Sequence, residues 1–215
     1  MKKLDGVIIR LSVGIGRNVL EAEEALKIAK KKKHQKKEFN IEIYSDKPIS
    51  HTLEVPKKVV SAYLRLEKKL SNSKDSLKDL EMLKRDHKTG LLNRFGYYVE
   101  KNKLIKQKKY GKNRFIIFFD ADSMHSLNNK YGYIFVDKYL TAIGKALNKN
   151  IRNRDQKDIL NVGETLNNRR NDTAGDEFII DIYCKEKDVL NITRRYLTKC
   201  YEYQRKINKR LKIRN

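Results

Sequence analysis

The chain has 215 residues, the length of one large domain or two small ones. Apolar residues make up 39% and charged residues 36%, so a core can form and an intrinsically disordered protein is excluded. The formal net charge of +23 favours contact with phosphate groups in nucleotides, nucleic acids or lipid headgroups, although lysines dispersed over a solvated surface explain it equally well.

The first 45 residues predict a β-α-β unit. The run from Gly6 to Gly16 is rich in β-branched residues and is closed by glycine, as expected of a buried strand. Residues 39–44 alternate between apolar and polar, which is typical of a half-buried strand. Between the two strands, helical spacing relates six apolar residues: Leu20, Ala22, Ala25, Leu26, Ile28 and Ala29.

Pro48 and Pro56 mark a connection between this unit and the next. Residues 57–85 carry apolar side chains at three- and four-residue spacing, which predicts one long helix or two helices broken near Ser73. The sequence leaves open whether this segment is a coiled-coil stalk or packs on its own domain. We assign residues 46–85 to a helical linker.

Residues 86–215 alternate between helical and strand patterns. We expect helices at 94–107, 135–147 and 187–209, and strands at 114–119 and 177–183. Residues 148–174 are polar and show no clear period, which predicts an exposed loop or hairpin.

The two cysteines, Cys184 and Cys200, indicate a reducing compartment. They lack C-x-x-C spacing and follow no secretory leader, which argues against a disulfide framework or a thiolate metal site. The most apolar short run, residues 115–119, is far too short to span a bilayer. We therefore expect a cytoplasmic protein with no membrane partner.

Acidic residues stand at the ends of two predicted strands. Asp120 follows the apolar run 115–119, and Asp176 and Glu177 precede the apolar run 178–180. Carboxylates in such positions can hold Mg²⁺ against a triphosphate, because hard cations prefer oxygen ligands. Acidic residues are common at strand edges, so the spacing alone does not establish a metal site.

Three motifs, in the same order along the chain, resemble the GGDEF family of diguanylate cyclases. Residues 86–94 read D-H-K-T-G-L-L-N-R and resemble the signature D-x-L-T-G-L-x-N-R. Residues 120–122 and 127–132 are similar to the family's D-x-D-x-F-K-x-I-N-D-x-x-G-H. Residues 174–178 read A-G-D-E-F and resemble the naming motif. Three ordered matches are more specific than any one of them.

Residues 1–45 resemble the C-terminal end of the same family's domain, which normally reads S-I-G-I-A, then a helix containing A-K, then a last strand. Residues 12–16 match the strand end, Ala29 and Lys30 match the helix, and residues 39–44 supply the strand. We therefore expect a circularly permuted GGDEF domain, with residues 86–215 as the remainder. A truncated upstream copy followed by a truncated downstream copy is the alternative, but each copy would expose a strand edge.

The fold that this resemblance implies is α/β (α+β). It is a palm-like, ferredoxin-like domain whose central, mainly antiparallel sheet of about five strands is flanked by helices.

The resemblance also implies a Mg²⁺ (or Mn²⁺) site. Asp120 and Glu177 match the family's metal ligands, with the carbonyl of Ala121 as a further ligand. Asp176 would help to activate the attacking 3′-hydroxyl. Carboxylates suit both tasks, as ligands of a hard cation and as proton acceptors.

Three further positions match the family's substrate contacts. Asn128 and Asp137 correspond to residues that read the edge of guanine, which implies GTP as the substrate. Lys30 corresponds to a lysine that contacts the triphosphate, although a member of the basic run 30–33 is also an ordinary solvated residue.

Several positions depart from the family's pattern. A charged residue, Asp172, replaces the arginine before the naming motif, and the family's inhibitory product site is absent, so we expect no product feedback there. The other substituted positions are Ala174, His125, Asn129, Tyr133 and Val136.

These departures leave three hypotheses. The first is a diguanylate cyclase that works as a homodimer and condenses two GTP into cyclic di-GMP and pyrophosphate. The second is a degenerate, catalytically inactive domain that binds a nucleotide and regulates a partner. A nucleic-acid-binding, polymerase-like protein is the third and is not favoured, since the sequence contains no aromatic stacking platform.

Overall fold

The structure is a computed structural model that describes residues 9–31, 40–44, 57–107, 113–149, 160–163 and 176–213. Its strands are β1 (Leu11–Gly16), β2 (Asn40–Ile43), β3 (Arg114–Ala121), β4 (Leu160–Gly163) and β5 (Glu177–Tyr183). Its helices are α1 (Val19–Lys31), α2 (Lys57–Lys69), α3 (Lys74–Leu83), α4 (Arg94–Lys106), α5 (Met124–Tyr131), α6 (Tyr133–Lys149) and α7 (Glu186–Ile213).

The strands form one sheet in the order β2-β1-β3-β5-β4. β1 and β2 are parallel and are joined through α1, whereas β1–β3, β3–β5 and β5–β4 are antiparallel pairs. The expected mixed fold, with a mainly antiparallel sheet of about five strands flanked by helices, is confirmed.

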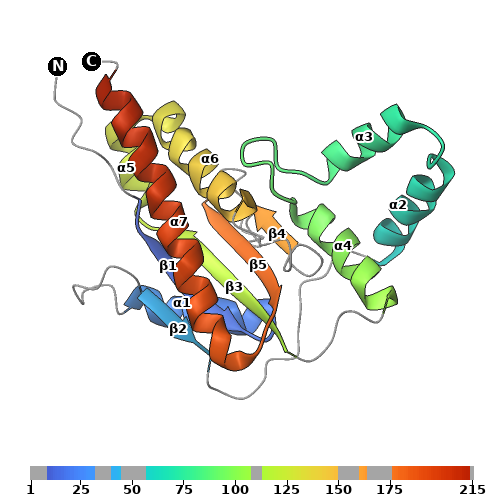
Figure 1. Cartoon of the computed structure of the whole chain (residues 1–215), viewed down its shortest axis with the longest axis horizontal. Coiled ribbons are helices and arrows are strands. Elements are labelled where there is room, and N and C mark those ends of the chain that lie inside the picture. The colour runs from blue at the N-terminus through green and yellow to red at the C-terminus, as the bar shows by residue number, and fades with distance from the viewer. Residues whose placement is uncertain are drawn as a thin grey trace.

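Both strands of the N-terminal unit, β1 and β2, belong to this sheet. β1 pairs with β3 along its whole length, so that residues 11–16 lie opposite residues 116–121. α7 then covers the start of β1: the Gln204 side chain accepts from the Ile9 N–H at 2.7 Å and donates to the Ile9 carbonyl at 3.2 Å. The beginning of the described chain and the C-terminal half of α7 therefore lie side by side (Figure 1).

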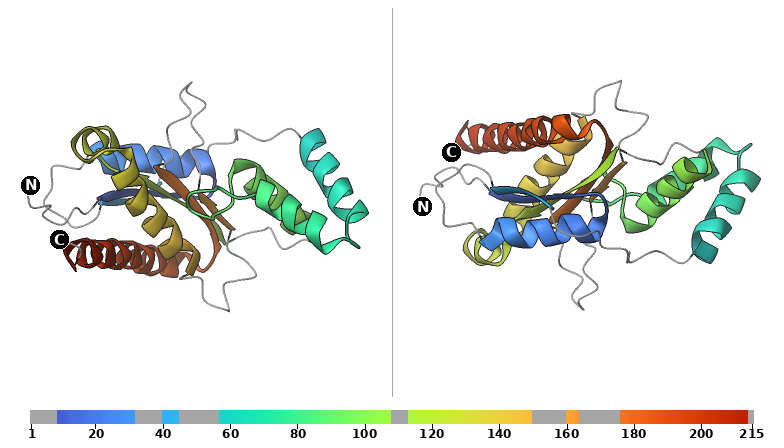
Figure 2. Two further views of the ribbon diagram at one scale, coloured as in Figure 1. Left: turned by 90° about the horizontal axis from the view of Figure 1, so that it is seen from above. Right: turned by 90° about the horizontal axis from the view of Figure 1, so that it is seen from below.

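Helices cover both faces of the sheet. α1 lies on one face and α6 and α7 lie on the other (Figure 2). Successive side chains of β3 point to opposite faces. Accordingly Ile116 and Phe118 pack with residues of α1 and α4, whereas Ile117 and Phe119 pack with residues of α6 and α7. The sheet is thus buried on both sides, which explains the continuous apolar run in β3.

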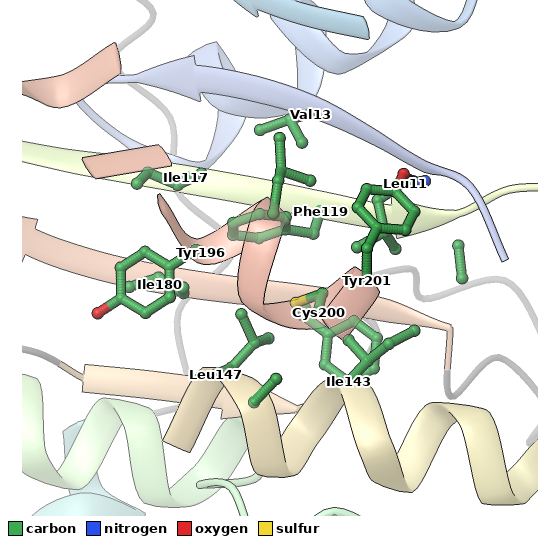
Figure 3. Packing of buried hydrophobic residues seen from close by; sticks show 14 of the residues in the cluster. Leu11, Val13, Ile117, Phe119, Ile143, Leu147, Ile180, Tyr196, Cys200 and Tyr201 are labelled. Atoms are coloured by element: carbon green, nitrogen blue, oxygen red, sulfur yellow. Dashed lines mark hydrogen bonds between the residues drawn. The ribbon is translucent and has the colours of Figure 1, made fainter. Parts of the chain in front are cut away.

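The larger core lies between the sheet and α6 and α7. α7 contributes Tyr196, Cys200 and Tyr201, which pack against β1 and β3 (Figure 3). Burying one apolar side chain in this core contributes roughly 1.5–3 kcal/mol.

Although α7 has 28 residues, no helix among the described residues is long and apolar enough to cross a membrane.

A buried ionic group fixes α4 on the opposite face. Asp181 of β5 is fully buried, accepts from Arg114 Nε at 2.9 Å and accepts from the Tyr97 hydroxyl at 3.1 Å. A buried carboxylate needs such partners because removing it from water is costly. This group lies at the end of β3 remote from Asp120.

The segment after Pro56 forms two helices. Ser73 caps α3, since its hydroxyl accepts from the Ser76 N–H, and this cap separates α3 from α2. Both helices pack within the chain: the Tyr63 ring meets Phe95 of α4 edge-on at 5.1 Å, and its hydroxyl donates to the Leu80 carbonyl at 2.9 Å.

Three elements of the structure were not expected in the form in which they occur. β3 extends to Ala121, so Asp120 lies within the strand rather than after it. β4 lies within the stretch expected to be a loop or hairpin. α5 was not expected: it has only eight residues, and its apolar side chains Met124, Leu127 and Tyr131 are only partly buried against the larger core. The expected strand residues 6–8 and Phe39 lie outside the described residues.

The packing of β1 on α1 predicts the effect of Gly14→Ala. A Cβ at Gly14 would lie 2.0 Å from the Ala22 carbonyl oxygen and 2.3 Å from the Leu26 amide nitrogen. Because both atoms are backbone, α1 would have to shift, and we expect a loss of roughly 2–3 kcal/mol in the free energy of unfolding, measured with urea. The control is Gly90→Ala, where nothing lies within 4 Å but φ is +73°. It should lose only about 1 kcal/mol through backbone strain, and equal losses would contradict the packing argument.

Candidate acidic site at the sheet edge

Three polar residues form a row across neighbouring strands. Ser12 of β1 pairs with Asp120 of β3, which in turn pairs with Glu177 of β5. Directly opposed residues of antiparallel strands point to the same face, with Cβ atoms about 5 Å apart. All three are buried. The sheet therefore holds the Asp120 and Glu177 side chains next to each other on the face that α1 covers.

Lys30 joins this row from α1. Its Nζ lies 2.7 Å from Asp120 Oδ2, and its side chain is 42% exposed whereas that of Asp120 is 9% exposed. One end of the ion pair is thus buried and the other reaches solvent. Lys30, which the family resemblance assigns to the triphosphate, is thus paired with Asp120, which the resemblance assigns to the metal ion.

The acidic residues disfavour one another's charge. The pKa of Glu177 is raised to about 7 by burial and then by the negative charges of Asp120 and Asp176, while Lys30 acts in the opposite direction. Burial, followed by the charge of Asp120, also raises the pKa of Asp176 above its usual value. The site therefore carries more negative charge than its single lysine offsets, and a cation would stabilise it.

A hydrogen-bonded turn follows the row. The Asp122 carboxylate accepts from the Ser12 hydroxyl at 3.1 Å, and the Asp122 N–H donates to the Arg10 carbonyl at 2.9 Å. The Ala121 N–H donates to the Asp176 carbonyl at 2.9 Å. The sequence predicted no role for Ser12 and Asp122, although both lie within the motifs that resemble the GGDEF family. In the structure they anchor the turn into α5.

The donor set fits a magnesium ion. Among the described residues there is no group of three or more His, Cys, Asp or Glu side chains that could hold a metal ion. Mg²⁺, however, is commonly bound through one or two carboxylates together with substrate phosphates. Asp120, Glu177 and the Ala121 carbonyl match that requirement. A divalent cation would offset both the burial and the neighbouring negative charges that raise the pKa of Glu177.

Asn128 and Asp137 lie apart from this row, on α5 and α6. The two helices meet at Gly132, whose N–H donates to the Asn128 carbonyl at 2.8 Å and whose carbonyl accepts from the Val136 N–H at 3.2 Å. The Asp137 carboxylate pairs with Lys88, with Nζ 3.0 Å from Oδ2. The structure therefore brings Lys30, Asp120, Asp176 and Glu177 together and places the two expected base-reading residues on either side of the α5–α6 junction.

The substituted positions have different environments. His125 and Asn129 lie one helical turn apart, with Asn129 Nδ2 3.1 Å from His125 Nε2. Val136 is buried in the larger core, and Tyr133 is 64% exposed. Two further departures, Asp172 and Ala174, lie outside the described residues.

Fold and site define a mixed α+β protein with an acidic site at the edge of an antiparallel sheet. Residues 83–160 match the family described as diguanylate cyclase, GGDEF domain. This match confirms the resemblance to the GGDEF family that the motifs at 86–94 and 120–132 predict. The third motif, at 174–178, lies beyond the matched segment. No curated protein matches the chain.

Among solved structures, the chain is similar to the diguanylate cyclase SiaD from Pseudomonas aeruginosa, solved in complex with its activator SiaC. The identity is 19%, the match covers 66% of this chain and 50% of that chain, and the TM-score is 0.46. It is also similar to the coiled coil and GGDEF domain of DgcB from Caulobacter crescentus in complex with c-di-GMP, at 12% identity over 66% of this chain and 68% of that chain, with a TM-score of 0.44. The chain thus spans half the length of the SiaD chain.

The raised pKa of Glu177 predicts a pH dependence of stability in the metal-free protein. The folded value of about 7 exceeds the ordinary value of 4.5, so the folded state binds the extra proton. The free energy of unfolding should therefore fall as pH rises from about 4.5 to about 7. Glu177→Gln should remove most of this fall and be more stable than the parent chain at about pH 8, by roughly 3 kcal/mol.

Urea unfolding in EDTA at about pH 5 and about pH 8 measures this difference. Glu202→Gln on α7, where the side chain is 38% exposed and pairs with Lys199, is the matched control and should keep the parent's pH dependence. A Glu177→Gln variant with the parent's pH dependence would contradict the electrostatic description of the site.

Proposed function

We propose that this protein is a Mg²⁺-dependent (or Mn²⁺-dependent) diguanylate cyclase that condenses two GTP into cyclic di-GMP and two pyrophosphates. The observation that carries the proposal is the pairing of Asp120 with Glu177 beside Asp176, in a chain whose segment 83–160 is GGDEF-family sequence. GTP and a reducing environment are both supplied by the cytoplasm, where we propose the protein works.

In this mechanism Asp120 and Glu177, with the Ala121 carbonyl, hold the metal ion. When bound, the ion neutralises charge on the phosphates of GTP. Lys30, whose side chain is partly exposed beside Asp120, would contact the triphosphate. These residues thereby hold the α-phosphate at the edge of the sheet.

Asp176 acts as the general base. Its raised pKa makes it a better proton acceptor than an ordinary aspartate, and it is adjacent in sequence to Glu177. It takes the proton of the 3′-hydroxyl, the 3′-oxygen forms a bond to the partner's α-phosphorus, and the bond from that phosphorus to the pyrophosphate oxygen breaks. Two such transfers close the ring, so the active unit is a homodimer with one GTP in each subunit.

A second candidate is a catalytically inactive domain that binds GTP and regulates a partner. His125, Asn129 and Tyr133 favour it, because each replaces a residue of the family's pattern on α5 or α6. Asp120, Asp176 and Glu177, by contrast, are retained, and we therefore rank catalysis first.

Incubation of the protein with GTP, ATP and Mg²⁺, with products resolved by mass spectrometry, distinguishes these functions. Cyclic di-GMP is the expected product. Asp120→Ala should abolish it through loss of the metal, and Asp176→Asn should slow it about 10²- to 10⁴-fold through loss of the base. Asp79→Ala, at an exposed carboxylate of α3, is the control and should retain activity. Nucleotide binding without product would favour the regulatory domain, and activity retained in Asp120→Ala would contradict the metal assignment.

We further propose that the domain is circularly permuted. The support is that β1 and β2, which are joined through α1, belong to the same sheet as β3 and β5, and that Ile9 is hydrogen-bonded to Gln204 near the end of α7. A domain in the family's usual order would follow α7 directly with β1.

A rearranged chain tests this directly. It would begin with residues 57–215, continue through a short flexible linker, and end with residues 1–44. Since the contacts of β1 with β3 and α7 do not depend on where the chain is cut, we expect the same circular dichroism spectrum and a stability within about 2 kcal/mol of the parent. Failure to fold would contradict the permutation.

A further inference from the structure

An ion pair joins Lys88 to Asp137, the residue that the family resemblance assigns to base recognition. Lys88 Nζ lies 3.1 Å from Asp137 Oδ1 and 3.0 Å from Oδ2, and the two residues are 49 positions apart in sequence. Their side chains are 45% and 37% exposed, so both reach the surface where a ligand could meet them. The pair therefore presents an ammonium donor and a carboxylate acceptor side by side.

The backbone around Lys88 is held in a defined turn. The Asp86 carboxylate accepts from the Thr89 N–H at 2.7 Å and from the Thr89 hydroxyl at 2.6 Å, and the Gly90 N–H donates to the Asp86 carbonyl at 2.9 Å. An Asp side chain that bonds the backbone in this way stabilises a turn locally.

This turn is packed on α6. A Cβ at Gly144 would lie only 2.5 Å from Thr89 Cβ, so the absence of a side chain there allows Thr89 to contact the helix closely. The contact holds the turn against the helix that carries Asp137. Lys88 is thus positioned beside Asp137 by packing, in addition to its charge.

Lys88 is also a change from the family signature, which has leucine at this place in D-x-L-T-G-L-x-N-R. A leucine offers no hydrogen-bond donor, whereas a lysine ammonium offers three. The contact with Asp137 does not use all three. A donor beside the base-reading carboxylate is therefore a feature of this particular chain.

We propose that Lys88 is a specificity-determining residue that donates to O6 of guanine while Asp137 accepts from N1–H and the 2-amino group of the same base. This inference rests on the proposed function and on the expectation, from the family resemblance, that Asp137 reads guanine. The 6-position of guanine is an acceptor and that of adenine is an amino donor. An adjacent donor and acceptor in this order match guanine and oppose adenine.

The test compares the binding of two nucleotides that cannot be condensed. GDP carries O6, and the diphosphate of 2,6-diaminopurine riboside has the same 2-amino group but an amino group at the 6-position. We expect the parent protein to bind GDP at least about tenfold more tightly by isothermal titration, since a hydrogen bond to a charged group is worth about this factor. Lys88→Met should weaken GDP binding about tenfold and leave the other nucleotide nearly unchanged, so that the preference falls about tenfold. The preference that remains reflects N1, which carries a hydrogen for Asp137 in guanine but not in 2,6-diaminopurine.

Two variants separate recognition from general charge. Lys138→Met removes an exposed positive charge from the residue next to Asp137 on α6 and should keep the preference for GDP. Lys88→Arg keeps a donor and should retain most of it.

An unchanged preference in Lys88→Met, with GDP bound normally by the parent, would overturn the role of Lys88 and leave the proposed function intact. No binding of GDP by the parent protein would overturn both. A purely structural role of the ion pair predicts equal weakening of the two nucleotides, which would also overturn the inference.

Discussion

The pairing of β1 with β3 is the contact on which the rest of the structure depends. It joins residues 11–16 to residues 116–121, more than a hundred positions along the chain, and so makes one sheet from two remote segments. Without it, β3 would have an open edge, and the apolar side chains of α1 would lose the surface against which they pack. The same pairing places Ser12 and, through α1, Lys30 beside Asp120.

The acidic site combines a stable scaffold with an unfavourable arrangement of charge. Continuous hydrogen bonding in β3 and β5 prevents Asp120 and Glu177 from moving apart, and burial keeps water from screening them. Burial, and then repulsion from Asp120 and Asp176, raises the pKa of Glu177. Such an arrangement persists only where the surrounding structure holds the groups in place, and perturbed pKa values are more frequent at functional sites.

Other buried charges in the molecule are compensated internally. Asp181 has Arg114 and Tyr97 as partners, and the Lys84 ammonium, in a side chain only 3% exposed, lies 2.7 Å from Glu100. These groups join α4 to the sheet and to α3, where a structural role accounts for them. The row at Asp120 differs because three carboxylates, those of Asp120, Asp176 and Glu177, lie around Lys30.

The sequence alone predicted the elements with strong patterns. The apolar run of β3 and the helical spacing of α1 each indicated the element that the structure contains, because burial leaves a pattern in the sequence. α5 is a short helix whose apolar residues are only partly buried, and β4 is too short to stand out in a polar stretch. The motifs at 86–94 and 120–132 likewise predicted the family whose model matches residues 83–160.

Tertiary structure alone decided which residues meet. Asp120 and Glu177 were named from motifs, but their opposition and the raised pKa of Glu177 depend on the register of β3 with β5, which no local pattern encodes. The contacts of Ser12 with Asp122 and of Lys88 with Asp137 span 110 and 49 positions. The sequence by itself therefore determined which elements form and which chemical groups are available. Packing of remote segments determined how those groups are arranged, because side-chain contacts across a sheet depend on the whole chain folding.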